Sequence, residues 1–255
     1  AVLSGEQSVG ELREVFEVAK GMSMKERLAL KLMYHRFLPT SELRPYICSI
    51  PPVVDTPLMW SDEKLKSHYK DWSEMQVRAK SAKMYLLQEY NKYMPLLFAK
   101  FPKLFTASTH TFSVWLWAMQ AVKSRNWAVN RESEPAVSTA MVPFVDMINH
   151  DMGLRGAART NLDGSKFTIL AWKNYSKGDE VFTSYGDDCN HYYRLSYGFE
   201  IPGNTHPCLR VNASKSWKDK EDALLWHWAT SGIGSNSVLP SKGAISATSF
   251  GGGKR

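Results

Sequence analysis

The first 130 residues carry the hydrophobic period of α-helices. Ser23 and Glu26 form the Ser-x-x-Glu pattern that caps the start of a helix, and Pro39 ends that helix. A second, long helix is predicted from Ser61, because two acidic residues follow it in the first turn. Apolar residues then recur along it at steps of three and four, which indicates one face packed on a core: Leu65, Tyr69, Trp72, Met75, Ala79, Ala82, Leu86, Tyr90 and Tyr93.

Prolines divide the rest of this helical part. Those between residues 41 and 57 predict an extended connector, and Pro95 and Pro102 are expected to end the long helix. Another helix is predicted at residues 109–124. Its buried positions include Trp115, Met119 and Val122.

The pattern changes after residue 135, where short apolar runs alternate with turns. Residues 167–172 and 180–185 look like strands, and an Asp-Gly or Lys-Gly turn precedes each of them. A short helix is predicted at residues 188–197, and Gly198 can end it in the left-handed conformation. Helices followed by short strands and turns predict an α+β fold.

The composition is that of an ordinary globular protein with a mildly basic surface. The formal charge is +7, but the 32 Lys and Arg residues are spread along the chain and form no block. We therefore expect no direct nucleic-acid binding. No apolar run reaches the roughly 18 to 20 residues that a membrane helix needs, so no membrane insertion is expected either. We expect a monomer.

Three segments carry residue types suited to a functional site. The first is the Asn-His pair at residues 149–150, which follows an apolar run. The second is residues 178–186, with the sequence Gly-Asp-Glu-Val-Phe-Thr-Ser-Tyr-Gly. The third, residues 190–199, ends in Tyr-Gly-Phe. Each segment taken alone is also compatible with a capped turn or the end of a strand.

In this order and at these separations, the three segments resemble the SET-domain methyltransferases. More narrowly, they are similar to the branch typified by the Rubisco large-subunit lysine methyltransferase and its animal relatives. In that branch an Asn-His pair, a Gly-Asp-Glu-Val strand with its Tyr-Gly end, and a Tyr-Gly-Phe end follow one another. Residues 56–61 and 122–125 also resemble that branch, and the resemblance covers most of residues 25–205.

The resemblance implies an α+β SET core of short strands with a helical insertion. Residues 1–115 would be the insertion, residues 116–205 the C-terminal catalytic part of the SET domain, and residues 206–255 the start of a C-terminal substrate-binding region that is truncated or disordered. The glycine-rich strand that opens the family's SET domain is not found in this sequence. We interpret the chain either as a truncated sequence or as a degenerate, inactive relative.

The resemblance also implies S-adenosyl-L-methionine as the cofactor and gives roles to individual residues. The positions that match cofactor-binding residues are Arg125, Asp146, Asn149, His150, Tyr185 and Phe199. Tyr185 also matches the catalytic tyrosine, and Tyr197 matches a position around the target side chain. No metal is expected, because the leaving group departs as a neutral thioether. The candidate ligands for a metal site are of suitable types but have no recognised spacing: Asp146, His150, Asp151 and His191.

The predicted function is transfer of a methyl group to a lysine of a protein substrate. Relatives that methylate an actin histidine carry a large aromatic residue just before the Asp of the Asn-His motif. This sequence has Val145 there, which favours lysine. Two alternatives stay open: a protein-histidine methyltransferase, and a non-catalytic SET-like module that binds a partner protein. The compartment also stays open between cytoplasm, nucleus and plastid.

Overall fold

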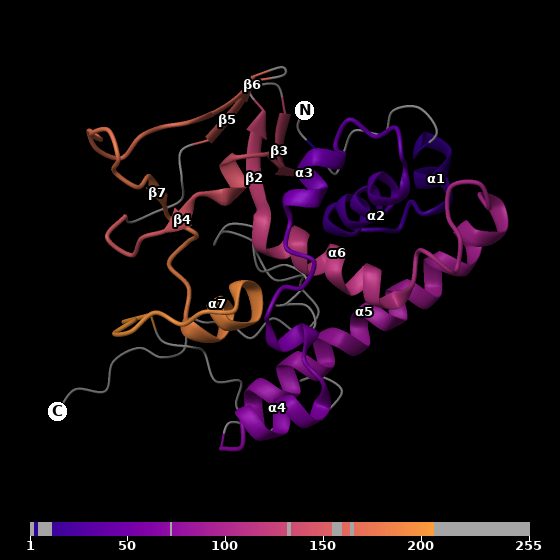
Figure 1. Ribbon diagram of the computed structural model, residues 1–255, viewed down its shortest axis with the longest axis horizontal. Coiled ribbons are helices and arrows are strands. Elements are labelled where there is room, and N and C mark those ends of the chain that lie inside the picture. Colours follow the sequence, from indigo (N-terminus) through magenta and orange to yellow (C-terminus); the bar gives the residue numbers. More distant parts are fainter. Residues whose placement is uncertain are drawn as a thin grey trace.

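In a computed structural model of the chain, the helices of the first 125 residues lie on one side, and most of the short strands and the last described helix lie on the other (Figure 1). The structure describes residues 3–4, 12–71, 73–131, 134–154, 160–163 and 166–206. Apart from residue 206, the predicted C-terminal region therefore lies outside the described residues. The boundary near residue 115 stays a prediction.

The described helices are α1 (Leu12–Val18), α2 (Met24–Phe37), α3 (Arg44–Ser49), α4 (Asp62–His68), α5 (Ser73–Lys100), α6 (Phe112–Arg125) and α7 (Asn190–Tyr197), with 3₁₀ turns η1 (Pro57–Met59) and η2 (Val145–Met147). The described strands are β1 (Leu3–Ser4), β2 (Asn126–Arg131), β3 (Glu134–Met141), β4 (Asn149–His150), β5 (Thr160–Asp163), β6 (Lys166–Ile169) and β7 (Phe182–Thr183). They form an antiparallel sheet in the order β1-β3-β2, a parallel pair β4-β7 and an antiparallel pair β5-β6.

The local signals for helix ends are confirmed. Ser23 and Glu26 form a complete capping box at the start of α2, and Ser61 caps α4. Helix α7 ends at Gly198, which adopts the left-handed conformation with φ 87° and ψ 3°. These signals are correct because each depends on residues within one turn of the helix end.

Three expectations about the helices are wrong. The proline-rich segment is not simply extended, because α3 begins there with Pro45 in its first turn, where a missing N–H is tolerated. The long helix is interrupted after α4, where the Tyr69 ring stacks on Trp60 and its carbonyl accepts a bond from Gln76 Nε2. Pro95 lies inside α5 rather than at its end, and α5 stops just before Pro102.

The strands differ more from expectation. Of residues 167–172 only the part up to Ile169 is in β6, and of residues 180–185 only Phe182–Thr183 forms a strand. Residue 164 of the predicted Asp-Gly turn lies outside the described residues. The β2-β3 pair was not predicted, because its mixed polar sequence lacks strict alternation of apolar and polar residues.

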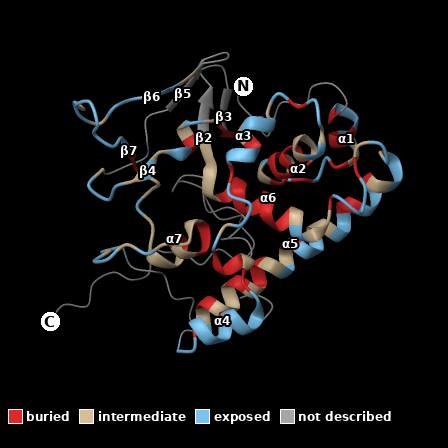
Figure 2. Ribbon diagram, viewed as in Figure 1, coloured by how far each residue is buried: buried red, intermediate tan, exposed pale blue. Residues whose placement is uncertain are grey.

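The main core lies between the helices, and α6 runs through its middle (Figure 2). Trp115, Met119 and Val122 of α6 are buried there, as predicted. Two side chains of α6 also bond to distant segments: Trp117 Nε1 donates to the Pro51 carbonyl at 2.9 Å, and Gln120 Nε2 donates to the Ser196 carbonyl at 2.7 Å. Helix α6 therefore links α7 to the segment that follows α3. No helix in the described part of the chain is long and apolar enough to cross a membrane.

Candidate functional site

The first two segments singled out in the sequence lie side by side. Strand β4 pairs in parallel with β7, so that Asn149 lies opposite Phe182 and His150 opposite Thr183. The pairing is extended by Asn149 Nδ2, which donates to Glu180 Oε1 at 2.7 Å. Two motifs about thirty residues apart in the chain thus form one edge of the site.

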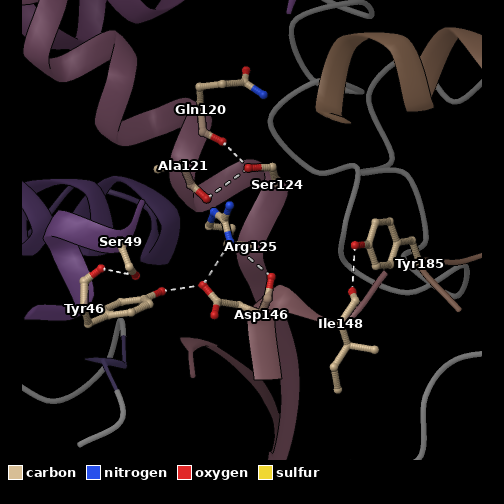
Figure 3. A network of polar contacts seen from close by, with 9 residues as sticks. All are labelled: Tyr46, Ser49, Gln120, Ala121, Ser124, Arg125, Asp146, Ile148 and Tyr185. Carbon is tan, nitrogen blue, oxygen red and sulfur yellow. Dashed lines mark hydrogen bonds and ion pairs between the residues drawn. The ribbon is translucent and has the colours of Figure 1, made fainter. Parts of the chain in front are cut away.

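Tyr185 follows β7, and both its backbone and its side-chain hydroxyl are held by hydrogen bonds. Its backbone N–H donates to His150 Nδ1 at 3.0 Å, and its hydroxyl donates to the Ile148 carbonyl at 2.8 Å (Figure 3). Because Nδ1 of His150 is the acceptor, the neutral imidazole carries its proton on Nε2. The predicted catalytic residue is therefore positioned by the residues on either side of Asn149.

The third segment brings further aromatic rings to Tyr185. The Tyr197 ring stacks on Tyr185 with centroids 4.6 Å apart, and the His150 ring stacks on Tyr185 at 5.2 Å. Tyr193 and Phe199 stack on each other at 5.5 Å, and Tyr193 lies 5.3 Å from His150. We call these five residues the aromatic cluster. Tyr193 was not predicted, although it lies four residues before Tyr197 and hence on the same helix face.

Burial favours the uncharged form of the titratable rings in the aromatic cluster, because it shifts each pKa away from the charged form. It raises the pKa of Tyr185, which the nearby Asp146 carboxylate raises further and Arg125 lowers. It also raises the pKa of Tyr197 well above its ordinary value and lowers that of His150. Neutral phenol and imidazole rings present π-faces that attract a cation.

Arg125 and Asp146, both predicted to bind the cofactor, are paired with each other. Arg125 Nη1 donates to the backbone carbonyl of Asp146 at 3.2 Å and lies 3.6 Å from the side-chain oxygen Oδ2 of Asp146. The same Oδ2 accepts the hydroxyl of Tyr46 at 2.6 Å, a contact between residues 100 positions apart (Figure 3). Burial raises the pKa of Asp146, while Tyr46 and Arg125 lower it. We call these three residues the Asp146 network.

A small hollow of about 120 Å³ opens beside the aromatic cluster. It is lined by His150, Met152, Gly186, Asp187, Tyr193, Thr205 and His206. Ligand pockets usually measure roughly 300–1,000 Å³, so this hollow accommodates only one part of a larger molecule. Two buried polar atoms next to the site, His150 Nε2 and Asp146 Oδ1, have no hydrogen-bond partner within the described ranges.

These features fit the cofactor that the resemblance implies. The uncharged rings suit a positively charged sulfur, and the hollow lies beside an aromatic wall that includes His150 and Tyr193. Arg125 keeps 22% of its side chain exposed and can still meet an anionic group. Across the described residues, no group of three or more His, Cys, Asp or Glu side chains could hold a metal ion.

Comparison with known proteins finds actin-histidine N-methyltransferases among the relatives of this chain. The chain is 26% identical over 223 residues to the actin-histidine N-methyltransferase of Mus musculus and 26% identical over 213 residues to that of Danio rerio. Each match covers 83% of this chain, but the chain spans only 36% of the length of these relatives. No protein-family model matches the chain.

Solved structures share the fold. The SET domain of LSMT bound to methyllysine and AdoHcy superposes with a TM-score of 0.67 at 20% identity, over 79% of this chain and 45% of that chain. Rubisco LSMT bound to AdoMet gives a TM-score of 0.68 at 20% identity, over 94% of this chain and 56% of that chain. The predicted α+β SET fold and the resemblance to the Rubisco methyltransferase branch are confirmed.

Proposed function

We propose that this chain, which has the SET fold, forms the reacting part of an S-adenosylmethionine-dependent protein methyltransferase. The observation that carries the proposal is the meeting of Asn149, His150 and Tyr185 beside a cluster of uncharged aromatic rings. The names of the similar proteins support it, since the solved structures hold AdoMet or AdoHcy and the curated relatives are protein methyltransferases.

This placement supports the predicted cofactor-binding residues. When bound, S-adenosylmethionine supplies a methyl group carried on a positively charged sulfur. Asn149 and His150 would hold it on one side, with Phe199 of the aromatic cluster beside them. Arg125 and Asp146 would form the charged wall of the same site.

Tyr185 orients the acceptor and stabilises positive charge. Its hydroxyl hydrogen is directed to the Ile148 carbonyl, so the lone pairs of its oxygen remain free to face a cationic centre. Because burial raises its pKa, Tyr185 does not act as a general base at neutral pH. The target side chain therefore loses its proton to solvent, helped by burial among the rings of Tyr185 and Tyr197.

We propose lysine as the target side chain within a protein substrate. Val145 supports this choice, since this position is aromatic in the relatives that act on histidine. Val145 packs on Ala140 and Val142. Histidine is the second candidate, because the curated relatives are named actin-histidine N-methyltransferases.

Calorimetric titration with S-adenosylmethionine tests the proposal, on this chain and on a version extended upstream. We expect Asn149→Ala to abolish binding. Tyr185→Phe should keep binding and lower the rate of transfer by about 100-fold, the effect of removing one oriented polar group at a reacting centre. If no form of the protein binds the cofactor, the non-catalytic module becomes the better interpretation.

The pH dependence of transfer separates the two targets. Lysine has an unperturbed pKa of about 10.4, so the rate on a lysine peptide should rise across pH 7 to 9. Histidine, with a pKa of about 6.5, should give a rate that levels off above pH 7.5. Peptides with Lys→Arg or His→Ala substitutions at the modified position serve as controls. Fragment mass spectrometry identifies the methylated residue.

A further inference from the structure

Turn η2 is anchored by a buried acidic residue as well as by apolar packing. Phe144 before the turn and Met147 within it are 84% and 60% exposed, whereas Asp146 is only 7% exposed. Val145 is partly buried against Ala140 and Val142, and Asp146 is the one fully buried residue of the turn. The position of η2 therefore depends in part on what binds the Asp146 carboxylate.

The backbone that enters η2 is strained. Phe144 has φ 69° and ψ −41°, and it is the only non-glycine residue with positive φ in the described part of the chain. A bulky side chain adopts such angles only where the surrounding structure enforces them. Since the Phe144 side chain is exposed, its own packing does not enforce them. The Asp146 network, two residues further on, and the bond from the Asp146 N–H to the Val142 carbonyl at 3.1 Å restrain this segment.

Tyr46 provides the rigid end of that network. It lies in α3, whose Ile47 side chain is buried in the main core, and its own ring packs against the same core. Its hydroxyl is bonded to Asp146 Oδ2 at 2.6 Å, a short distance typical of a bond to a carboxylate. Because α3 is fixed on the core, this bond ties η2 to the helical part of the chain.

The restraint is passed directly to Tyr185. Ile148 follows η2, and its N–H donates to the Val145 carbonyl at 3.2 Å, so the turn fixes the peptide unit that leads into Ile148. The carbonyl of the same residue accepts the Tyr185 hydroxyl at 2.8 Å. Figure 3 shows Tyr46, Asp146 and Arg125 on one side of this segment and Tyr185 on the other.

We infer that Tyr46 is a positioning residue for Tyr185: it holds Asp146, and through η2 the carbonyl of Ile148 that accepts the Tyr185 hydroxyl. The inference rests on the proposed function and extends it to a residue of the helical part that does not touch the aromatic cluster in any contact described above. Loss of the Tyr46 hydroxyl leaves the aromatic rings in place but releases the carbonyl that orients Tyr185.

Tyr46→Phe tests the inference, because it removes one hydroxyl and keeps the ring. Steady-state kinetics on the longest active form of the protein should give a kcat lower by about tenfold, the factor expected for one hydrogen bond to a charged group. The KM for the protein substrate should change by less than twofold, since Tyr46 takes part in none of the described ring contacts of the aromatic cluster.

Tyr85→Phe is the matched control. Tyr85 also lies in the helical part, and its hydroxyl donates to a carboxylate oxygen of the buried Glu26 at 3.1 Å, far from the site in sequence and fold. It should lower the thermal unfolding midpoint about as much as Tyr46→Phe while leaving kcat unchanged. Kinetics are measured well below both midpoints, so that a loss of folded protein does not contribute.

The acid limb of the kcat profile gives a second readout. The groups that face Asp146 are Tyr46 from α3, Arg125 from α6 and Tyr185 beyond β7. The bond from Tyr46 lowers the pKa of Asp146 against the effect of burial, so its loss should move the acid limb to higher pH. Tyr85→Phe should leave the limb in place.

The outcomes separate the two proposals. A wild-type protein that neither binds S-adenosylmethionine nor transfers a methyl group removes the proposed function and this inference with it. If the wild type transfers and Tyr46→Phe has the same kcat and the same acid limb, only the inference is wrong. An equal loss of kcat in Tyr85→Phe also overturns the inference, because any weakening of the helical part would then be enough to lower kcat.

Discussion

Replacement of Gly198 with alanine should destabilise the protein for two separable reasons. Gly198 has φ 87°, a conformation that costs a side chain-bearing residue about 1–2 kcal/mol. A Cβ built at this position would lie 2.6 Å from the carbonyl oxygen of Asp55, which is backbone and cannot rotate away. Relieving such a contact costs about 1–3 kcal/mol, so we expect a total loss of about 2–5 kcal/mol.

Gly203→Ala measures the conformational cost alone, so its difference from Gly198→Ala isolates the cost of the contact with Asp55. Gly203 also has positive φ, at 70°, but a Cβ there would meet no atom within 4 Å. Its loss should therefore be only the conformational cost of about 1–2 kcal/mol. Urea unfolding of both variants gives the difference, expected at about 1–3 kcal/mol in favour of Gly203→Ala. Equal losses would refute the contact with Asp55, and two neutral variants would refute the left-handed conformation itself.

The same variant has a consequence for the site. Gly198 lies between Tyr197 and Phe199, both in the aromatic cluster, so a shift of its backbone moves two rings at once. Methyl transfer by Gly198→Ala should fall more than transfer by Gly203→Ala at equal fractions of folded protein. A radioactive-methyl transfer assay below both unfolding midpoints measures this.

Two further predictions concern stability. Burial lowers the pKa of His150 in the folded state, so the unfolded chain binds the proton more tightly and stability should fall as the pH drops below about 6.5. In His150→Gln, which keeps an acceptor but does not titrate, the free energy of unfolding should fall less than in the wild type as the pH drops from 7 to 5. Parallel pH dependences of the two proteins would contradict the assignment of this effect to His150. Pro95→Ala should raise the free energy of unfolding by about 1–3 kcal/mol, because the N–H within α5 regains its bond to the Asn91 carbonyl. A thermal midpoint that stays constant or falls in that variant would show that the helix is adapted to proline.

The sequence predicted those features that depend on near neighbours. The capping box at Ser23 and the left-handed Gly198 are each specified within a few residues, and both are confirmed. The interruption before α5 was missed, since it depends on Tyr69 stacking on Trp60 rather than on a local breaker. Strands of only two residues, such as β4 and β7, also leave no periodic pattern to detect.

The candidate site shows the same division. The Asn-His pair and Tyr185 were recognised by resemblance, and the structure brings them together. Arg125 and Asp146 were assigned to the cofactor, but their pairing with each other was not foreseen. Tyr46 carried no signal at all, because its partner lies 100 positions further along the chain and one sequence does not reveal contacts at that distance.

The long separations within the site also set the order in which it can form. Tyr46 must meet Asp146 across 100 positions, Gln120 must meet Ser196 across 76, and β4 must wait for β7 before it has a partner. Loops of this length close late and slowly, whereas the helices that precede them form early from local contacts. During synthesis, the helical part can fold while the site is still absent. The stacking of Tyr197 on Tyr185 forms only after the chain beyond Tyr185 has been made, which makes activity a reporter of the completed fold.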